Sequence, residues 1–192
     1  MKKLIVLMLV VFIILAIPVV MYLQNINKDY DSFQTSTKKT TKEVSEVFNS
    51  SQNTEEEEKR VKLYIAVMRD AFKINNGGNR FIAIKKDTLV GLDEKSKEKV
   101  LEGFKDLSPN LYWFEDIKEN KSFFILDENY KDLVAATING TLLYVNLIEF
   151  KDNEAVIEAT SWYGNLGAVI PTYKAIYKNG QWELKNIGTG IA

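Results

Sequence analysis

The 192-residue chain carries 25 basic and 26 acidic side chains, and it contains neither histidine nor cysteine. These two absences exclude Ser-His-Asp and Cys-His catalysis within the chain, zinc, haem or iron–sulfur sites with His or Cys ligands, and a disulfide framework. The charge is balanced and no basic run is dense enough for a nucleic-acid interface. We therefore predict no metal, no cofactor and no nucleic-acid partner.

The first predicted element is a membrane-spanning helix. Leu4 to Leu23 is a run of twenty residues without a charge, long enough to cross a hydrocarbon layer of about 30 Å. Lys2 and Lys3 precede it, which predicts a cytoplasmic N-terminus and a C-terminal domain outside. The alternative is a secretory signal peptide, followed by secretion after cleavage. Such peptides have a shorter apolar core and a small-x-small cleavage site, which is absent here, so we expect an uncleaved signal anchor in the cell membrane.

The remaining chain divides into a spacer and a domain. Residues 24–54 are rich in Ser, Thr, Asn, Gln and Lys without sustained apolar periodicity, and this composition is typical of a polar stalk. Residues 55–192 have the length of one ordinary domain with a sizeable core. The predicted organisation is therefore a cytoplasmic N-terminus at 1–3, a transmembrane signal anchor at 4–23, a stalk at 24–54 and an extracytoplasmic domain at 55–192.

Two amphipathic helices are predicted at the start of this domain. Thr54 to Glu57 fits a capping box, so a helix should begin there, and apolar residues at helical spacing run from Val61 to Phe72. Asn75 to Gly78 should end it. The second helix is predicted from about Asp93 to Asp106. For the short apolar segment Phe81 to Ile84 between them, strand and loop both stay open.

From Leu111 onward the apolar pattern alternates as in strands. Asn139-Gly140 and Asn179-Gly180 each predict a two-residue hairpin turn, and Lys151 to Asn153 predicts a third connection. The fold class is therefore α+β: after the transmembrane helix, two helices pack on one face of a curved antiparallel sheet of about five to six strands. The predicted strands are Leu111 to Glu115, Ser122 to Leu126, Val134 to Ile138, Thr141 to Phe150, Glu154 to Tyr163, Ala168 to Lys178 and Gln181 to Ile187.

The order of elements and the closing segment YKAIYKNGQWELKNIG, with its predicted hairpin and tryptophan, resemble the nuclear-transport-factor-2-like (cystatin-like α+β) superfamily. The resemblance covers Glu55 to Ala192 and implies a domain of this fold behind an N-terminal membrane anchor, as in many bacterial members. Phe81 to Leu89 has no counterpart that we can assign, and the histidine of several enzymatic members is missing. Members include enzymes, binding modules and assembly domains, so the resemblance implies no single function.

Aromatic residues at strand ends are the candidate contact site. Trp162 and Tyr163 precede the loop that contains Asn165, and two glycines of this loop, Gly164 and Gly167, permit a positive φ and a sharp bend. We expect this loop, with Trp113 as its neighbour, to contact a ligand or partner. Two other interpretations stay open, because such a loop is also typical of a plain hairpin turn and aromatic residues in strands commonly pack in the core.

Glu149 and Glu158 are the candidate pocket carboxylates, since both interrupt otherwise apolar strands. A pocket that raises the pKa of such a group would make it a general acid or base. By strand alternation, Glu149 is expected on the face of Leu147 and Glu158 on the face of Trp162. The alternative is that both residues mark the solvent side of the sheet.

We expect a non-enzymatic, membrane-anchored ectodomain that binds a protein of the cell envelope or a small apolar ligand, or that forms a homodimer. The alternative is a hydrolase or isomerase that uses a pocket carboxylate. A cavity with convergent polar groups and a buried Glu or Asp would favour the enzyme. A filled interface between sheet and helices would favour binding through an outer surface.

Overall fold

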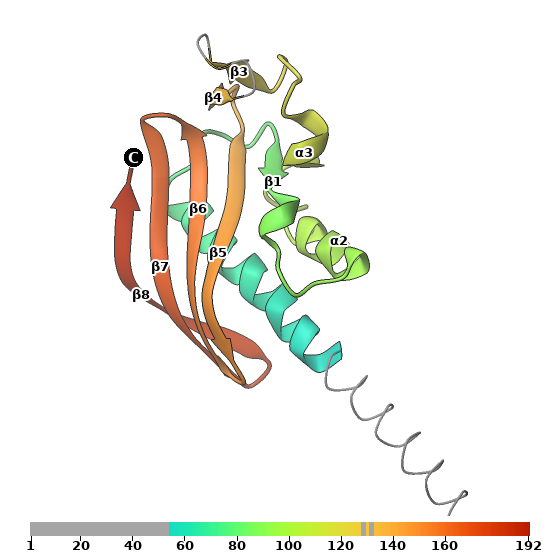
Figure 1. Cartoon of the computed structure of the whole chain (residues 1–192), viewed down its shortest axis with the longest axis vertical. Helices are drawn as coiled ribbons and strands as arrows, with labels where there is room; N and C mark the ends of the chain where they lie inside the picture. The colour runs from blue at the N-terminus through green and yellow to red at the C-terminus, as the bar shows by residue number, and fades with distance from the viewer. Residues whose placement is uncertain (1–53, 128–129, 131–132) are drawn as a thin grey trace, which may run out of the picture. The chain divides into compact units, whose positions relative to one another are not determined.

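A computed structural model describes residues 54–127, 130 and 133–192. The predicted membrane span, Leu4 to Leu23, and the stalk up to residue 53 lie outside the described residues. None of the helices within the described ranges has the length and apolar character that a membrane crossing requires. Asn53–Ala192 forms one compact unit, and its class is α+β, as predicted (Figure 1).

The described residues form three α-helices, one short 3₁₀ helix and a single mixed sheet of eight strands. The prediction of an antiparallel sheet of five to six strands is therefore wrong in both strand number and direction. The helices are the long helix of residues 54–74, η1 (Lys86–Thr88), α2 (Glu94–Glu102) and α3 (Phe114–Ile117). The strands are β1 (Ile82–Ile84), β2 (Leu111–Trp113), β3 (Phe124–Leu126), β4 (Val134–Thr137), β5 (Thr141–Lys151), β6 (Glu154–Gly164), β7 (Gly167–Lys178) and β8 (Gln181–Ile191).

The helices follow their sequence signals with two differences. Thr54 is already helical, so the predicted cap at this residue is wrong, and the Glu57 carboxylate accepts from the backbone N–H of Asp93 instead. Asp93 in turn is the N-cap of α2, because its carboxylate accepts from the N–H of Ser96 at 2.7 Å. The predicted strand from Leu111 ends early at Trp113, where α3 begins with acidic residues in its first turn.

The mixed character of the sheet comes from β1. This strand lies between β2 and β5 and runs parallel to both. All three of its residues are buried, because Ile82 and Ile84 pack in the main core while Ala83 packs on the opposite side. Burial on both faces removes the alternation that marks a strand in the sequence. Strands β5 to β8 form the expected antiparallel meander.

The predicted hairpin at Asn139-Gly140 is wrong. Both β4 and β5 pair antiparallel with β6, so the two strands run in the same direction and the chain does not reverse between them. Asn139 has a φ of 57°, which produces a kink, whereas Gly140 lies against the ring of Phe81, where a Cβ would overlap the ring. As a result β4 extends beyond the first residue of β5. The β3–β4 hairpin lies at the top of Figure 1.

The other two predicted turns are confirmed. Asn179 and Gly180 have φ angles of 52° and 82° and join β7 to β8. Asp152, with a φ of 52°, lies in the connection between β5 and β6. These turns fix the register of the β5–β6 and β7–β8 hairpins.

One face of the sheet, here called the inner face, is filled by the long helix, which passes behind the long strands in Figure 1. Tyr64 and Met68 of the helix pack with Leu143 and Tyr173 of the strands, and all four are fully or almost fully buried. The Tyr173 hydroxyl donates to Asp70 at 2.7 Å, and burial together with this carboxylate raises the pKa of the phenol.

The C-terminal hairpin is tied to the same helix. The indole N–H of Trp182 in β8 donates to the backbone carbonyl of Lys59 at 2.8 Å. The Trp182 ring also packs beside Phe150 of β5 and Tyr177 of β7. The last strand therefore closes the inner face at the start of the described helix.

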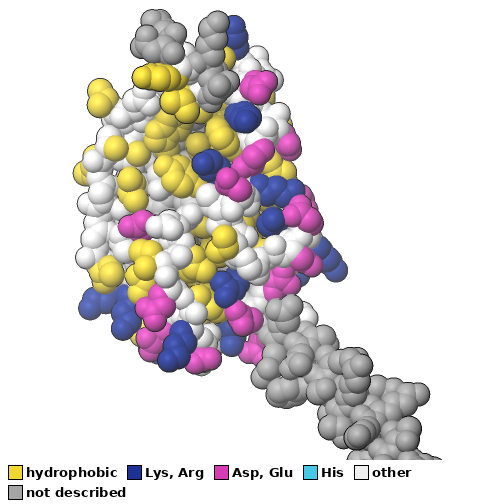
Figure 2. Space-filling view, viewed as in Figure 1, with side chains coloured by type: hydrophobic (Ala, Val, Ile, Leu, Met, Phe, Trp, Pro, Cys, Tyr) yellow, Lys and Arg dark blue, Asp and Glu magenta, His cyan; other side chains and the backbone are white. Residues whose placement is uncertain are grey.

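Among the described elements, α3 and the β3–β4 hairpin cover one end of the opposite face, here called the outer face. Phe81, Ile117, Phe124 and Leu142 form a second, smaller buried cluster there. Farther along β5, Ile148 is 55 % exposed. Figure 2 views this face and shows hydrophobic side chains gathered in its upper half, with basic and acidic side chains beside them.

Candidate functional site

A groove with a volume of about 560 Å³ lies on the outer face beside the second cluster. We call it the Trp162 groove, after the tryptophan on its floor. Its apolar floor consists of Phe114, Leu133, Val134, Leu142, Tyr144 and Trp162. Its polar rim consists of Lys85, Asp87, Glu115, Lys118 and Asn165.

Strand alternation determines which side chains lie at the centre of the groove floor. Leu142 and Tyr144 are two residues apart in β5 and therefore point to the same face. Leu142 pairs with Trp162 of β6, so the indole lies beside both side chains. Asn165 follows in the turn after β6, where its backbone N–H donates to the carbonyl of Ala135 at 3.1 Å. The aromatic rings of Tyr144 and Trp162, at the centre of the floor, are only half buried.

The rim comes from two short elements that are far apart in the sequence. Lys85 and Asp87 lie at η1, and Glu115 and Lys118 lie at α3. Both oxygens of Glu115 accept from the backbone N–H of Lys86, at 3.1 and 3.2 Å, which joins the two elements. The rim carries two cations and two anions, so it has no net charge.

Several polar groups of the groove have no partner among the described residues. Lys85 Nζ lies 5.8 Å from the centroid of the Tyr144 ring. Considering the part of the chain that the structure describes, no hydrogen bond or ion pair engages the side chains of Asp87, Lys118 or Asn165, the Tyr144 hydroxyl or the Trp162 indole N–H. The groove therefore offers both donors and acceptors beside an apolar floor.

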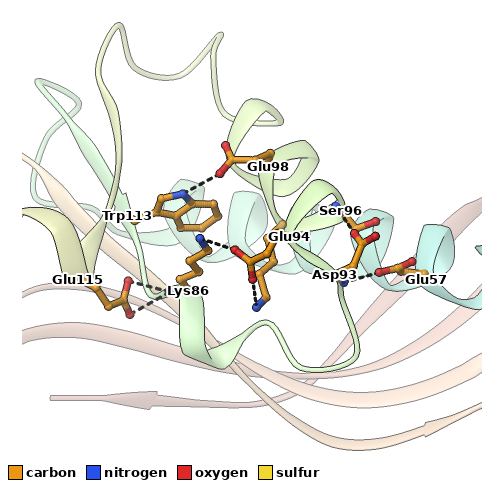
Figure 3. A network of polar contacts seen from close by, with 9 residues as sticks. Glu57, Lys86, Asp93, Glu94, Ser96, Glu98, Trp113 and Glu115 are labelled. Atoms are coloured by element: carbon orange, nitrogen blue, oxygen red, sulfur yellow. Dashed lines mark hydrogen bonds and ion pairs between the residues drawn. The ribbon is translucent and has the colours of Figure 1, made fainter.

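A polar network behind the rim holds η1 in place (Figure 3). Lys86 Nζ lies 2.6 Å from one carboxylate oxygen of Glu94, and Lys97 Nζ lies 2.9 Å from the other. These two lysines lower the pKa of Glu94 to about 2. Lys86 also lies 5.1 Å from the ring centroid of Trp113, whose indole N–H donates to Glu98 at 3.0 Å. This network fixes the segment that carries Lys85 and Asp87 against α2 and β2.

The structure brings two of the four predicted contact residues together. Trp162 and Asn165 both line the groove. Trp113 is 8 % exposed and belongs to the main core and the network of Figure 3, so it does not line the groove as a neighbour of Trp162.

Tyr163 points away from the groove, since it follows Trp162 in the same strand. Its hydroxyl accepts from the side-chain amide of Asn75 at 3.1 Å, and its ring lies against Gly167, where a Cβ would overlap it. Neither Gly164 nor Gly167 has a positive φ, so the prediction that these glycines bend the loop through a positive φ is wrong. Here Gly167 provides space for an aromatic ring, and the sharp turn falls on the two residues between the glycines.

The face predicted for Glu149 is wrong because of a β-bulge. Leu147 pairs with Ile157, but Glu149 pairs with Val156, the adjacent residue of β6. Adjacent strand residues point to opposite faces, so the bulge turns Glu149 to the outer face. Glu149 is exposed there and lines a second hollow of about 470 Å³ at the β5–β6 turn, together with Lys174.

Glu158 lies on the face of Trp162, as predicted, but outside the groove. It pairs with Asn146 across β5 and β6, and its carboxylate accepts from the Asn146 amide at 3.0 Å. Neither Glu158 nor Glu149 is buried. The two predicted pocket carboxylates are thus on the solvent side and do not meet in one cavity.

Sequence reasoning missed most of the groove. Leu142 and Tyr144 carried a usable signal, because alternation in a hairpin would place them on the face of Trp162 once the register was known. No sequence signal marked Lys85, Asp87 or Phe114, since these residues come near β6 only through the parallel insertion of β1 and the early end of β2.

No family model, no curated protein and no solved structure matches this chain. The resemblance to the nuclear-transport-factor-2-like superfamily therefore stays a prediction.

Proposed function

We propose that this chain is a single-pass, membrane-anchored extracytoplasmic protein whose domain is a non-enzymatic binding module of the cell envelope. The Trp162 groove is its proposed binding site, and the apolar run Leu4 to Leu23 is its proposed anchor. The observation that carries the proposal is the combination, in one groove, of an aromatic floor with polar rim groups that have no partner among the described residues.

The groove has the properties of a small-ligand site. Such sites commonly measure about 300–1,000 Å³ and combine an apolar lining with a few polar groups that orient the ligand. The volume of about 560 Å³ lies within this range. Trp162 contributes a large apolar surface that is only half buried without a ligand.

Two observations favour binding over catalysis. Fully buried side chains such as Tyr64 and Leu143 fill the interface between the helix and the inner face, where an enzyme of the alternative type would need its cavity. Glu149 and Glu158 are both on the solvent side of the sheet, and neither lies in the Trp162 groove.

The binding site is tested with the full-length chain in phosphatidylcholine nanodiscs and the neutral apolar dye N-phenyl-1-naphthylamine. After subtraction of the signal of empty nanodiscs, we expect saturable dye fluorescence that Trp162→Ala abolishes, because the substitution removes the centre of the apolar floor. Ile148→Ala, on the same face but outside the groove, is the matched control and should leave the signal unchanged. Equal dye binding by the wild type and Trp162→Ala would contradict the site.

The anchor is tested by adding a protease to intact cells. We expect the protease to digest the domain while a fragment that contains Leu4 to Leu23 stays with the membrane, since the run predicts a cytoplasmic N-terminus. Lysed cells give the control for complete digestion. Recovery of a soluble product that lacks this run would show cleavage and secretion instead.

A further inference from the structure

We propose that the ligand of the Trp162 groove is a neutral carbohydrate, bound with one sugar ring on the face of Trp162 and its hydroxyl groups bonded to the rim. This inference rests on the proposed function of the groove as a binding site. It adds the chemical class of the ligand, which follows from the floor, the rim and the openness of the groove.

The floor suits the apolar face of a sugar ring. A pyranose presents several C–H groups on one side, and these carry a small positive charge that is attracted to the negative face of an aromatic ring. Trp162 provides the largest such face and Tyr144 a second one nearby, and both rings are half buried. Aromatic rings that are partly exposed in this way suit a flat ligand better than an acyl chain, which gains most from complete enclosure.

The rim suits hydroxyl groups, which both donate and accept hydrogen bonds. Lys85 and Lys118 donate, Asp87 accepts, and the Asn165 amide does both. The side chains of Asp87, Lys118 and Asn165 have no hydrogen bond or ion pair within the described residues, so a sugar would displace no bond among these residues. Because every unpaired polar group can pair with a hydroxyl, such a ligand would leave none of them desolvated without a partner.

The charge balance of the rim argues against a charged ligand. An anion bound near Lys85 and Lys118 would be repelled by the carboxylates of Asp87 and Glu115. A cation bound near these carboxylates would be repelled by the two lysines. A neutral ligand with many hydroxyls avoids both repulsions. The groove lies on the outer face of the sheet, where the ends of an oligosaccharide can extend beyond it.

The test uses the full-length chain in phosphatidylcholine nanodiscs, with cellotetraose and chitotetraose as two neutral probes. We expect at least one of them to bind saturably in isothermal titration calorimetry. Trp162→Ala should weaken binding about tenfold or more, because it removes the stacking face. Asp87→Asn replaces an exposed charge and should weaken binding several-fold without a change in folding. It provides the decisive comparison if Trp162→Ala does not fold.

Salt and control variants separate the possible outcomes. Binding of a neutral sugar should be unchanged between about 50 and 500 mM salt, since screening acts only on ionic attraction, and Ile148→Ala should bind like the wild type. If the dye binds the groove but neither tetrasaccharide binds, the carbohydrate assignment is wrong and the binding site stands. If neither dye nor sugar depends on Trp162, both proposals fail. Equal sugar binding by the wild type, Trp162→Ala and Asp87→Asn would also overturn the assignment.

Discussion

The inner and outer faces of the sheet differ in how their aromatic side chains are used. On the inner face, Tyr64 and Tyr173 are buried, and each hydroxyl has a partner, the carbonyl of Val90 and the carboxylate of Asp70 respectively. On the outer face, Tyr144 and Trp162 are half buried, and their polar atoms have no partner among the described residues. Buried polar atoms with hydrogen-bond partners specify a fold, whereas partly exposed polar atoms without such partners are suited to a ligand.

The largest expected effect is the loss of a side chain from the inner face. Leu143→Ala should lower the free energy of unfolding by about 2–5 kcal/mol, because it leaves a cavity in a filled core. Ile148→Ala in the same strand should change it by less than about 0.5 kcal/mol, since Ile148 is mostly exposed. Urea unfolding of both variants measures the difference. Equal losses would remove the distinction between the two faces.

A smaller effect is expected at the kink that leads to the outer cover. Gly140→Ala should destabilise the fold by about 1–3 kcal/mol, because the new methyl group would overlap the Phe81 ring. Gly188→Ala is the matched control, since no atom lies within 4 Å of a Cβ at that position and its φ is not positive. Thermal unfolding of the two variants decides the point, and a stable Gly140→Ala protein would contradict the observed packing.

A pair of hydroxyl deletions gives the most direct comparison of the faces. Tyr173→Phe should cost about 1 kcal/mol, because it removes the hydrogen bond to Asp70. Tyr144→Phe should leave the free energy of unfolding unchanged, since the described residues provide no partner for that hydroxyl. Chemical denaturation measures both. A loss in Tyr144→Phe as large as in Tyr173→Phe would assign that hydroxyl a structural role.

The smallest effect concerns the network behind the groove. Lys86 and Lys97 lower the pKa of Glu94 from 4.5 to about 2. The ionised carboxylate therefore stabilises the fold above the unfolded pKa, and this contribution is lost as the pH falls from about 4.5 towards 2. Glu94→Gln should make the unfolding midpoint slightly less dependent on pH in this window. A pH profile identical to that of the wild type would mean that solvent screens the pairs completely.

The sequence predicted those elements whose signals are local. Apolar spacing marked the long helix from Val61 to Phe72, and alternation marked β5 to β8. Asn179-Gly180 predicted its turn because both residues have the left-handed conformation that this turn type requires. The α+β class followed from this order of helices and strands.

The errors arose where long-range contacts decide the structure. Asn139-Gly140 looks like a hairpin turn, but pairing of both β4 and β5 with β6 makes it a kink. One bulged residue reversed the face of Glu149, and alternation cannot reveal such an insertion. The rim residues Lys85 and Asp87 reach the groove only through the parallel insertion of β1. The strand end and the turn that carry Trp162 and Asn165 are local features, so the sequence could place these two residues near each other, and their role as contact residues stays a prediction.

The bond between Trp182 and the carbonyl of Lys59 has a consequence for folding during synthesis. The two residues are 123 positions apart, and Tyr173 and Asp70 are 103 apart. At about 5–20 residues per second, roughly 6–25 s pass between the synthesis of the helix and that of its last partner strand. During this interval the apolar side of the helix has no β7 or β8 to cover it. Nascent chains that end before β7 should therefore bind chaperones, and proteases should cut them faster than complete chains.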